Sequence, residues 1–167
     1  TIKDNSGAMV EINSETDFVA RNELFQNFVQ TCSELVLLSK NDIDALQKLP
    51  FPNANRSVNE ELINNIATIG ENMNIRRAEY LEVSNGVLIS YVHNSVAEGL
   101  GRLGVLVALE TGVQNNNIKE IGKQIAMHIA ATSPKSLHIE DLDPEVVERE
   151  RQVLIDQAMS SGKPKEI

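Results

Sequence analysis

Apolar and polar residues follow two different rhythms along this chain, and the two periods separate strands from helices. From residue 2 to residue 13 they alternate around Asp4-Asn-Ser-Gly7, which predicts a β-hairpin. Asn22 then precedes apolar residues spaced three and four positions apart, as expected for one face of a capped helix. Those positions are Leu24, Phe25, Phe28, Val29, Cys32, Leu35 and Val36. The chain is therefore expected to begin with a hairpin and a long amphipathic helix.

Two further helices are predicted before the next strands. A short one lies near Asp42–Leu49, ahead of a loop rich in proline and asparagine. Ser57 and Glu60 form a capping box, so a longer helix begins there and ends at Gly70. Its predicted buried residues are Leu62, Ile63, Ile66 and Ile69.

The following segments have the composition of strands. Residues 75–84 and 87–93 are predicted strands that Asn85-Gly86 joins in a hairpin, because this dipeptide favours the tight turns of hairpins. A further strand covers Leu103–Glu110. Its Val-Leu-Val core predicts burial on both faces and a central position in the sheet.

The last third of the chain has helical periodicity. Isoleucines at 118, 121, 125 and 129 mark a helix that Ser133-Pro134 stops. Asp143-Pro144 fits an N-cap followed by proline at the first helical position. Apolar residues then recur after seven positions, at 146, 147, 153 and 154, a coiled-coil-like spacing.

These elements predict an α+β fold. It consists of an antiparallel sheet with helices packed on one side, followed by a helical subdomain and the start of a helical hairpin. We expect an N-terminal core subdomain over residues 1–112. Residues 113–167 would form a partial C-terminal subdomain and the start of a coiled-coil hairpin, with the boundary near Gly112–Asn117.

The charge balance narrows the classes of partner. The chain has 24 acidic and 15 basic residues, a formal net charge of -9. This disfavours nucleic acid as a direct partner, because phosphate binding needs a basic surface. The charge is compatible with attraction to a basic patch on another protein and equally with simple solubility.

Cysteine content and terminal sequence bear on compartment and completeness. Cys32 is the only cysteine, so an internal disulfide is excluded and a reducing compartment is expected. Its place on the apolar helix face predicts a core residue. We find neither a signal peptide nor an apolar run of membrane-spanning length, and no membrane association is predicted. The first residue is threonine within a predicted strand, which we interpret as a piece of a longer protein.

Asp17 and Phe18 form the most informative pair. Neighbours in sequence cannot both point into one core unless the backbone turns, so one of them is expected to face outward. An outward Asp-Phe pair on a junction loop is a plausible protein-docking tip, since aromatic anchors dominate interface energetics. The alternative is a helix-capping aspartate beside a phenylalanine folded back on the sheet. The residues alone leave both interpretations open.

Catalytic and metal chemistry find little support. The three histidines are scattered and none is spaced four residues from a second ligand, so neither a metal site nor a bound cofactor is predicted. Glu11, Glu15 and Asp17 lack the nucleophile or glycine loop that would complete a catalytic site. No catalytic residue is assigned, and the Arg76-Arg77 pair is interpreted as a solvated or salt-bridged strand edge.

Five stretches, in order along the chain, carry a family resemblance. Residues 11–22, Glu-Ile-Asn-Ser-Glu-Thr-Asp-Phe-Val-Ala-Arg-Asn, resemble the strand-to-helix signature of elongation factor Ts. Residues 69–77, residues 90–93 with 101–107, residues 125–134 and residues 161–167 resemble the same family. Together the five cover nearly the whole chain, so an accidental match is not expected.

The resemblance implies guanine nucleotide exchange on elongation factor Tu, without covalent chemistry. It implies that the Asp17-Phe18 tip enters near the magnesium and switch region of the partner, while Ile69 and His93 contact its G domain and phosphate-binding loop. The partner-binding residues that it indicates are Thr16, Asp17, Phe18, Val19, Ile69 and His93. One departure concerns the position after His93, where the family has glycine and this chain has Asn94, at the start of a longer predicted loop, Asn94–Gly101.

The same resemblance sets expectations about context. Magnesium and nucleotide would belong to the partner, a homodimer is an option for the full-length protein, and the compartment would be the bacterial cytoplasm or an organelle matrix. The heptad-like spacing at 146–154 keeps a different class open, a non-catalytic dimerisation or assembly module. A hydrolase or transferase is the third option.

Overall fold

The computed structural model describes residues 1–112 and 116–160. The chain divides into two compact units, Thr1–Ala131 and Thr132–Ile167. Strands of the first unit are β1 (Ile2–Lys3), β2 (Ser6–Ser14), β3 (Met73–Glu82), β4 (Gly86–Ala97) and β5 (Leu100–Glu110). Helices beside them are η1 (Val19–Arg21), α1 (Glu23–Ser39), α2 (Ile43–Lys48), α3 (Val58–Ile69) and α4 (Asn116–Thr132). The second unit contains η2 (Ile139–Asp141) and α5 (Pro144–Ser160).

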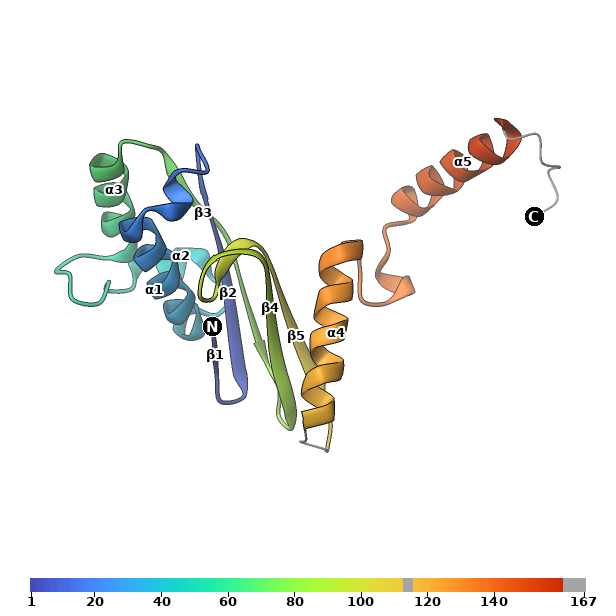
Figure 1. Cartoon of the computed structure of the whole chain (residues 1–167), viewed down its shortest axis with the longest axis horizontal. Coiled ribbons are helices and arrows are strands. Elements are labelled where there is room, and N and C mark those ends of the chain that lie inside the picture. The colour runs from blue at the N-terminus through green and yellow to red at the C-terminus, as the bar shows by residue number, and fades with distance from the viewer. Residues whose placement is uncertain (113–115, 161–167) are drawn as a thin grey trace. The chain divides into compact units, whose positions relative to one another are not determined.

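The first unit is built in layers, and the predicted α+β class is confirmed. One antiparallel sheet has the order β1-β2-β3, and β4 and β5 form a second antiparallel pair. Helices α1, α2 and α3 cover one face of β1–β3, and the β4–β5 pair lies on the other face, with α4 on its far side (Figure 1). Glycines allow the close approach of the sheets: a Cβ added at Gly104 would lie 2.7 Å from Met9 Sδ.

The main core lies between the helices and β1–β3. Its largest fully buried side chains are Phe28, Leu46, Val36, Val58 and Cys32. Phe28 stacks on Phe51, with ring centroids 5.7 Å apart. A smaller core lies between β5 and α4 and centres on Val105, Val107 and Ala126.

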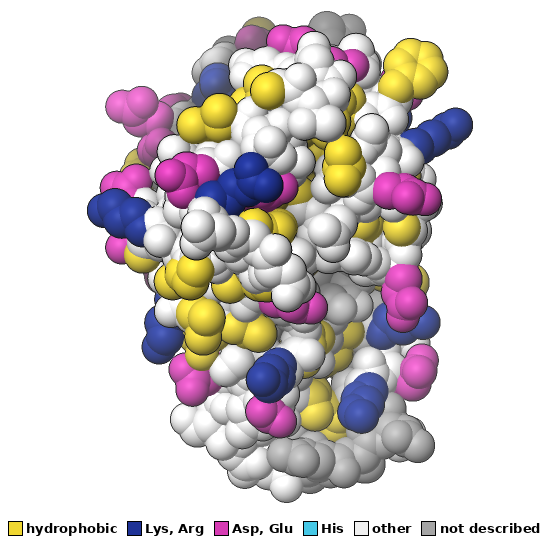
Figure 2. All heavy atoms as spheres, turned by 90° about the vertical axis from the view of Figure 1, so that its left-hand side faces the viewer, with side chains coloured by type: hydrophobic (Ala, Val, Ile, Leu, Met, Phe, Trp, Pro, Cys, Tyr) yellow, Lys and Arg dark blue, Asp and Glu magenta, His cyan; other side chains and the backbone are white. Residues whose placement is uncertain are grey.

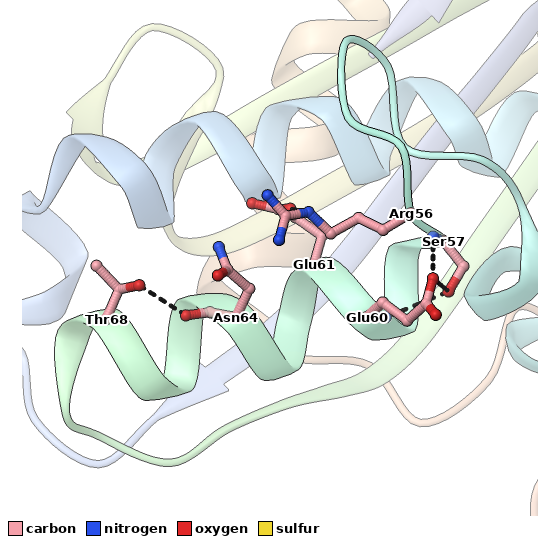
Figure 3. A network of polar contacts seen from close by, with 6 residues as sticks. All are labelled: Arg56, Ser57, Glu60, Glu61, Asn64 and Thr68. Atoms are coloured by element: carbon pink, nitrogen blue, oxygen red, sulfur yellow. Dashed lines mark hydrogen bonds and ion pairs between the residues drawn. The ribbon is translucent and has the colours of Figure 1, made fainter.

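Local signals for the helix ends are confirmed. Asn22 Oδ1 accepts hydrogen bonds from the backbone N–H groups of Leu24 and Phe25 at the start of α1. Asp42 caps α2 through the N–H of Ala45. The reciprocal Ser57–Glu60 capping box is formed at the start of α3 (Figure 3). Each of these contacts joins residues close in sequence, which is why the sequence predicts them.

Two predicted buried positions are wrong. Leu24 and Ile63 are 49% and 57% exposed, whereas Asn65 of α3 is only 3% exposed. The remaining predicted core positions of α1 are buried or partly buried in the main core. The apolar stripe is therefore narrower than the sequence suggests, and two of its members remain on the surface.

The predicted hairpin across Asn85-Gly86 is also wrong. Strand β3 pairs with β2, and β4 pairs with β5, so Asn85-Gly86 lies in the connection from one sheet to the other. Gly86 belongs to β4 opposite Glu110, where an added Cβ would collide with the carbonyl oxygen of Leu109. The glycine is therefore required by close strand pairing, a need that local sequence cannot distinguish from a turn.

The hairpin of this region lies later, between β4 and β5. Their register runs from Gly86↔Glu110 to Ala97↔Leu100, so the predicted loop Asn94–Gly101 is instead mostly paired strand around a tight turn. Among the described residues β5 pairs with β4 alone and is not central. Its burial arises from packing on both faces, against β2 through Leu106 and against α4 through Val107.

Helix α4 faces the sheet with only some of its isoleucines: Ile129 packs against the smaller core, and alanine and glycine supply the rest of the contact. Ala126 is fully buried and an added Cβ at Gly122 would collide with Ile89, whereas Ile121 and Ile125 are 49% and 37% exposed. Because α4 packs on β4–β5, it belongs to the first unit, which ends at Ala131 in the last turn of this helix. The assignment of subdomains to residues 1–112 and 113–167 stays a prediction, and residues 113–115 lie outside the described part.

Up to Ser160, where the described part of the second unit ends, its one long helix is α5. Asp143 Oδ1 accepts from the N–H of Glu145, as expected for an N-cap ahead of α5. No residue of α5 is buried, and Val147, Val153 and Leu154 are all more than two-fifths exposed. The coiled-coil hairpin stays a prediction, and the motif at residues 161–167 lies outside the described residues. Within the described ranges, every helix is too short or too polar to cross a membrane.

Cys32 is expected to resist thiol reagents in the folded protein. Its side chain is fully buried, and burial raises the pKa of the thiol to about 12. Since the thiolate is the reactive species, labelling by a disulfide reagent at pH 8 should be at least about a thousandfold slower than for a free cysteine. Absorbance of the released thiolate measures the rate, and the same reaction in concentrated guanidinium chloride is the control. Rapid labelling under native conditions would contradict this prediction.

The Glu11 carboxylate is expected to stabilise the protein at neutral pH. A register irregularity after Glu11 turns two consecutive arginines toward it, with Arg76 Nη1 at 2.8 Å and Arg77 Nε at 2.6 Å. Hydrogen bonds from Arg76 first, and then the Arg77 guanidinium, lower the pKa of Glu11, opposed by partial burial. The predicted salt-bridged strand edge at Arg76-Arg77 is thereby confirmed.

Glu11→Gln should therefore lower the free energy of unfolding above the ordinary glutamate pKa of about 4.3. The difference from wild type should shrink as pH falls further and vanish below the lowered pKa of the folded state. Urea unfolding at a series of pH values checks this, with Glu79→Gln at an exposed position of β3 as control. A difference that grows in acid would have the wrong sign.

Candidate partner-binding surface

The Asp17-Phe18 pair occupies an exposed tip between β2 and η1. The Phe18 side chain is 80% exposed, whereas that of Val19, the next residue, is only 3% exposed. Phe18 is not folded back on the sheet. The cap of α1 comes from Asn22, and the carboxylate of Asp17 points to an arginine, so the capping alternative is not observed.

Thr16 holds the near side of the tip. Its N–H donates to Glu71 Oε2 at 3.0 Å, and its hydroxyl donates to Glu71 Oε1 at 2.6 Å. The hydroxyl of Ser14 donates to the carbonyl oxygen of Thr16 at 3.0 Å. All the polar groups of Thr16 are thus engaged within the protein, although the loop is exposed.

Ile69 lies close to this anchor. It ends α3, is half-buried against the main core, and precedes Gly70, whose φ of 82° terminates the helix. Glu71 follows directly and makes the contacts with Thr16. The structure therefore brings Ile69 at the end of α3 near the Asp17-Phe18 tip, as expected if both contact the same partner.

Asp17 links the tip to the β4–β5 hairpin. Its Oδ2 lies 3.2 Å from Arg102 Nη2, with both side chains about two-thirds exposed. Arg102 precedes Leu103, which pairs with His93 across the hairpin. Arg102, which contacts the tip, is therefore the neighbour in sequence of the residue that pairs with His93.

The His93 side chain points to the other face of that hairpin. Neighbouring residues of a strand face opposite ways, so His93 and Leu103 share the α4 side while Arg102 faces the β2 side. His93 is exposed, and its Nδ1 lies 3.0 Å from the Tyr91 hydroxyl. Asn94 adopts a φ of 51°, a left-handed conformation that asparagine tolerates and glycine prefers. Asparagine can therefore occupy the position at which the resemblance implies glycine.

Sequence reasoning missed two residues of this surface, Glu71 and Arg102. Both lie inside stretches that carry the family resemblance, which is the signal that could have singled them out. Their contacts with the tip span 55 and 85 residues, respectively, so spacing along the chain cannot reveal them.

Charged side chains and metal-ligand residue types do not indicate a second kind of site among the described residues. The face formed by α1–α3 carries acidic and basic side chains interspersed with apolar ones (Figure 2). In the described part of the chain no group of three or more His, Cys, Asp or Glu side chains is arranged to hold a metal ion. The arrangement is that of a surface with one projecting aromatic residue.

Comparison with known proteins identifies the family. The model of the family described as elongation factor TS matches residues 15–167. The chain belongs to the elongation factor Ts family.

Curated relatives agree with this assignment. Elongation factor Ts of Rhodospirillum centenum is 56% identical over 162 residues, 97% of this chain and 53% of the relative. That of Zymomonas mobilis is 54% identical over 166 residues, 99% of this chain and 54% of the relative. That of Rhizorhabdus wittichii is 50% identical over all 167 residues, 54% of the relative. The chain thus spans about half the length of these elongation factor Ts proteins.

The elongation factor Ts match includes the whole of the tip. It begins at residue 15, ahead of Thr16, and extends through Glu71 and Arg102. The three segments that meet at the tip therefore all lie within the part shared with the family.

Proposed function

We propose that this chain promotes release of GDP from elongation factor Tu during translation elongation, as a nucleotide exchange factor without covalent chemistry. Membership of the elongation factor Ts family supports the class of function. The observation that carries the proposal is Phe18, a large aromatic side chain left 80% exposed beside a buried neighbour. Exposed aromatic residues on a fixed loop are typical anchors of protein interfaces.

The mechanism we propose is thermodynamic linkage. A protein that binds the nucleotide-free partner more tightly than the GDP-bound partner must weaken GDP by the same factor. Each tenfold loss of GDP affinity needs about 1.4 kcal/mol of differential binding. Burying the exposed Phe18 ring in a pocket that opens only when GDP is loosened would contribute about 1.5–3 kcal/mol, one or two such steps.

The neighbouring residues have distinct proposed roles. Asp17 brings a carboxylate toward the partner's magnesium site, where negative charge disturbs metal coordination. Ile69 and His93 press on the phosphate side of the nucleotide site. Thr16 and buried Val19 belong to the same surface mainly as its supports, because they fix the backbone on either side of the tip.

Magnesium and nucleotide are proposed to be bound by the partner, and no cofactor is assigned to this chain. The relatives are bacterial proteins, and we place the activity in the bacterial cytoplasm. The net charge of -9 favours approach to a basic region of the partner, which would speed encounter at low salt.

The direct test is release of a fluorescent GDP analogue from elongation factor Tu, with and without this chain. We expect faster release that rises with the concentration of the chain and saturates. A pull-down with nucleotide-free partner accompanies it. Absence of both acceleration and binding would contradict the proposal.

A second candidate is an assembly module that dimerises through α5. The exposed Val147, Val153 and Leu154 of that helix favour it. Sedimentation of the chain over a range of concentrations distinguishes the two functions. Self-association without any effect on GDP release would support the module, and a monomer that accelerates release would exclude it.

A further inference from the structure

We propose that Glu71 is a positioning residue of the exchange reaction, acting through Thr16 on the Asp17-Phe18 tip. This inference rests on the function proposed above and adds a residue that lies outside the Asp17-Phe18 tip. Its carboxylate holds the near end of the tip in one place before the partner arrives. The role follows from the geometry of its contacts.

Both oxygens of the Glu71 carboxylate are used on a single residue. Oε2 accepts the backbone N–H of Thr16 at 3.0 Å, and Oε1 accepts its hydroxyl at 2.6 Å. Two bonds from one rigid group fix orientation as well as position, and bonds to an ionised acceptor are stronger than neutral ones. Because one of them is to the main chain, it fixes the path of the backbone into Asp17.

The tip is only two residues long between its supports. Thr16 is held on one side, and Val19 is buried in the core on the other. The carbonyl oxygen of Phe18 also accepts the N–H of Arg21 at 3.1 Å. With both ends fixed, Asp17 and Phe18 have few alternative backbone conformations. Releasing Thr16 would oblige the partner to order the tip on binding, which lowers affinity and rate.

The end of α3 aims Glu71 at this loop. Gly70 has a φ of 82°, which reverses the chain direction after the helix and places residue 71 outside it. The resulting contact joins residues 55 apart in sequence. The end of α3, which carries Ile69, is thereby tied to the tip that carries Phe18.

The Arg102–Asp17 pair is the competing candidate for the same role. Its single contact is 3.2 Å long, and its side chains are 63% and 68% exposed. Flexible, exposed ion pairs of this kind contribute little and are screened by salt. We therefore assign positioning to Glu71, which makes two contacts with Thr16, one of them to the main chain, and not to Arg102, which makes a single contact.

The first test compares GDP release from elongation factor Tu with Glu71→Ala, Glu71→Gln and wild type. Loss of two charge-assisted hydrogen bonds should make Glu71→Ala about tenfold slower. Glu71→Gln should recover most of the rate, because its amide can accept from the Thr16 N–H and donate to the hydroxyl oxygen. Glu79→Ala, at an exposed position of β3, is the matched control and should behave as wild type. Equal rates for wild type and Glu71→Ala would overturn the proposal.

A double variant separates positioning from a general folding defect. If Glu71 acts through the tip, Glu71→Ala should cost little further rate once Phe18→Ala has removed the side chain that it positions. Fully additive losses would mean that Glu71 acts elsewhere, and would overturn the role assigned here.

The last test needs no partner. Hydrogen exchange measured by NMR should show the Thr16 amide protected in wild type and about tenfold less protected in Glu71→Ala. Unchanged protection would overturn the positioning role, whatever the exchange assay gives. Failure of the wild-type chain to accelerate GDP release would instead overturn the proposed function, so the two failures are distinguishable.

Discussion

Replacing Phe18 by alanine is expected to slow GDP release from elongation factor Tu by about ten- to a hundredfold relative to the wild-type chain. The ring is 80% exposed in the free protein, so its burial is available to the complex. Truncation removes the apolar area that we propose to be buried only when GDP is loosened. Release of a fluorescent GDP analogue at several concentrations of the chain measures the effect.

The folded state provides the control for this prediction. An exposed side chain contributes little to folding, so Phe18→Ala should change the free energy of unfolding by no more than about 0.5 kcal/mol. Leu38→Ala is a matched substitution, because Leu38 is 72% exposed near the opposite end of α1 from the tip. A slow Leu38 variant, or a Phe18 variant as fast as wild type, would refute the anchoring role.

Phe28→Ala is expected to destabilise the first unit by about 3–5 kcal/mol. Phe28 is 1% exposed and stacks on Phe51 at a centroid distance of 5.7 Å, in the core between α1 and its neighbours. Removal of the ring would leave a cavity that the surrounding helices fill only partly. Since domains of this size are stable by about 5–15 kcal/mol, the loss would be a large share of the total.

Denaturant unfolding followed by circular dichroism measures this loss as a shift in midpoint at constant slope. Leu24→Ala is the control on the same helix, because Leu24 is 49% exposed and should cost less than about 1 kcal/mol. Equal midpoints for the two variants would show that the core is not organised around Phe28.

The features that the sequence predicts correctly are those in which the interacting residues lie within a few positions of each other. Asn22 caps α1 through residues two and three positions ahead, and Ser57 and Glu60 cap each other within one turn. The turn at Asp4-Asn5 is equally local, with Lys3 pairing directly with Ser6. Such contacts form with almost any arrangement of the rest of the chain, so local chemistry suffices to predict them.

Strand pairing depends on distant residues and was predicted less well. Asn85-Gly86 has the composition of a hairpin turn, yet Gly86 is small because it packs against the carbonyl oxygen of Leu109. The apolar run of β5 correctly indicates burial on both faces, but sequence does not reveal that a second sheet and α4 supply it, in place of flanking strands. The competing arrangements differ only in contacts between segments far apart.

The tip shows the same division. Elementary geometry predicts that one of Asp17 and Phe18 faces outward, because adjacent side chains cannot share one core, and the structure leaves both exposed. The contact between Thr16 and Glu71 does not follow from it, since a glutamate after a helix-ending glycine is ordinary in sequence and its partner is 55 residues away. The roles of Thr16, Asp17, Phe18, Val19, Ile69 and His93 toward a partner stay predictions.

A tip fixed between Thr16 and Val19 also bears on the timing of recognition. Because the backbone at Asp17 and Phe18 is already in place, the first collision with a partner would not wait for a loop to fold. The association rate would then depend on diffusion and on attraction between the net charge of -9 and a basic region of the partner, and it would fall as salt is added. Variants of the tip would therefore differ mainly in the dissociation rate of the complex, and the residence time would report the effect of each substitution.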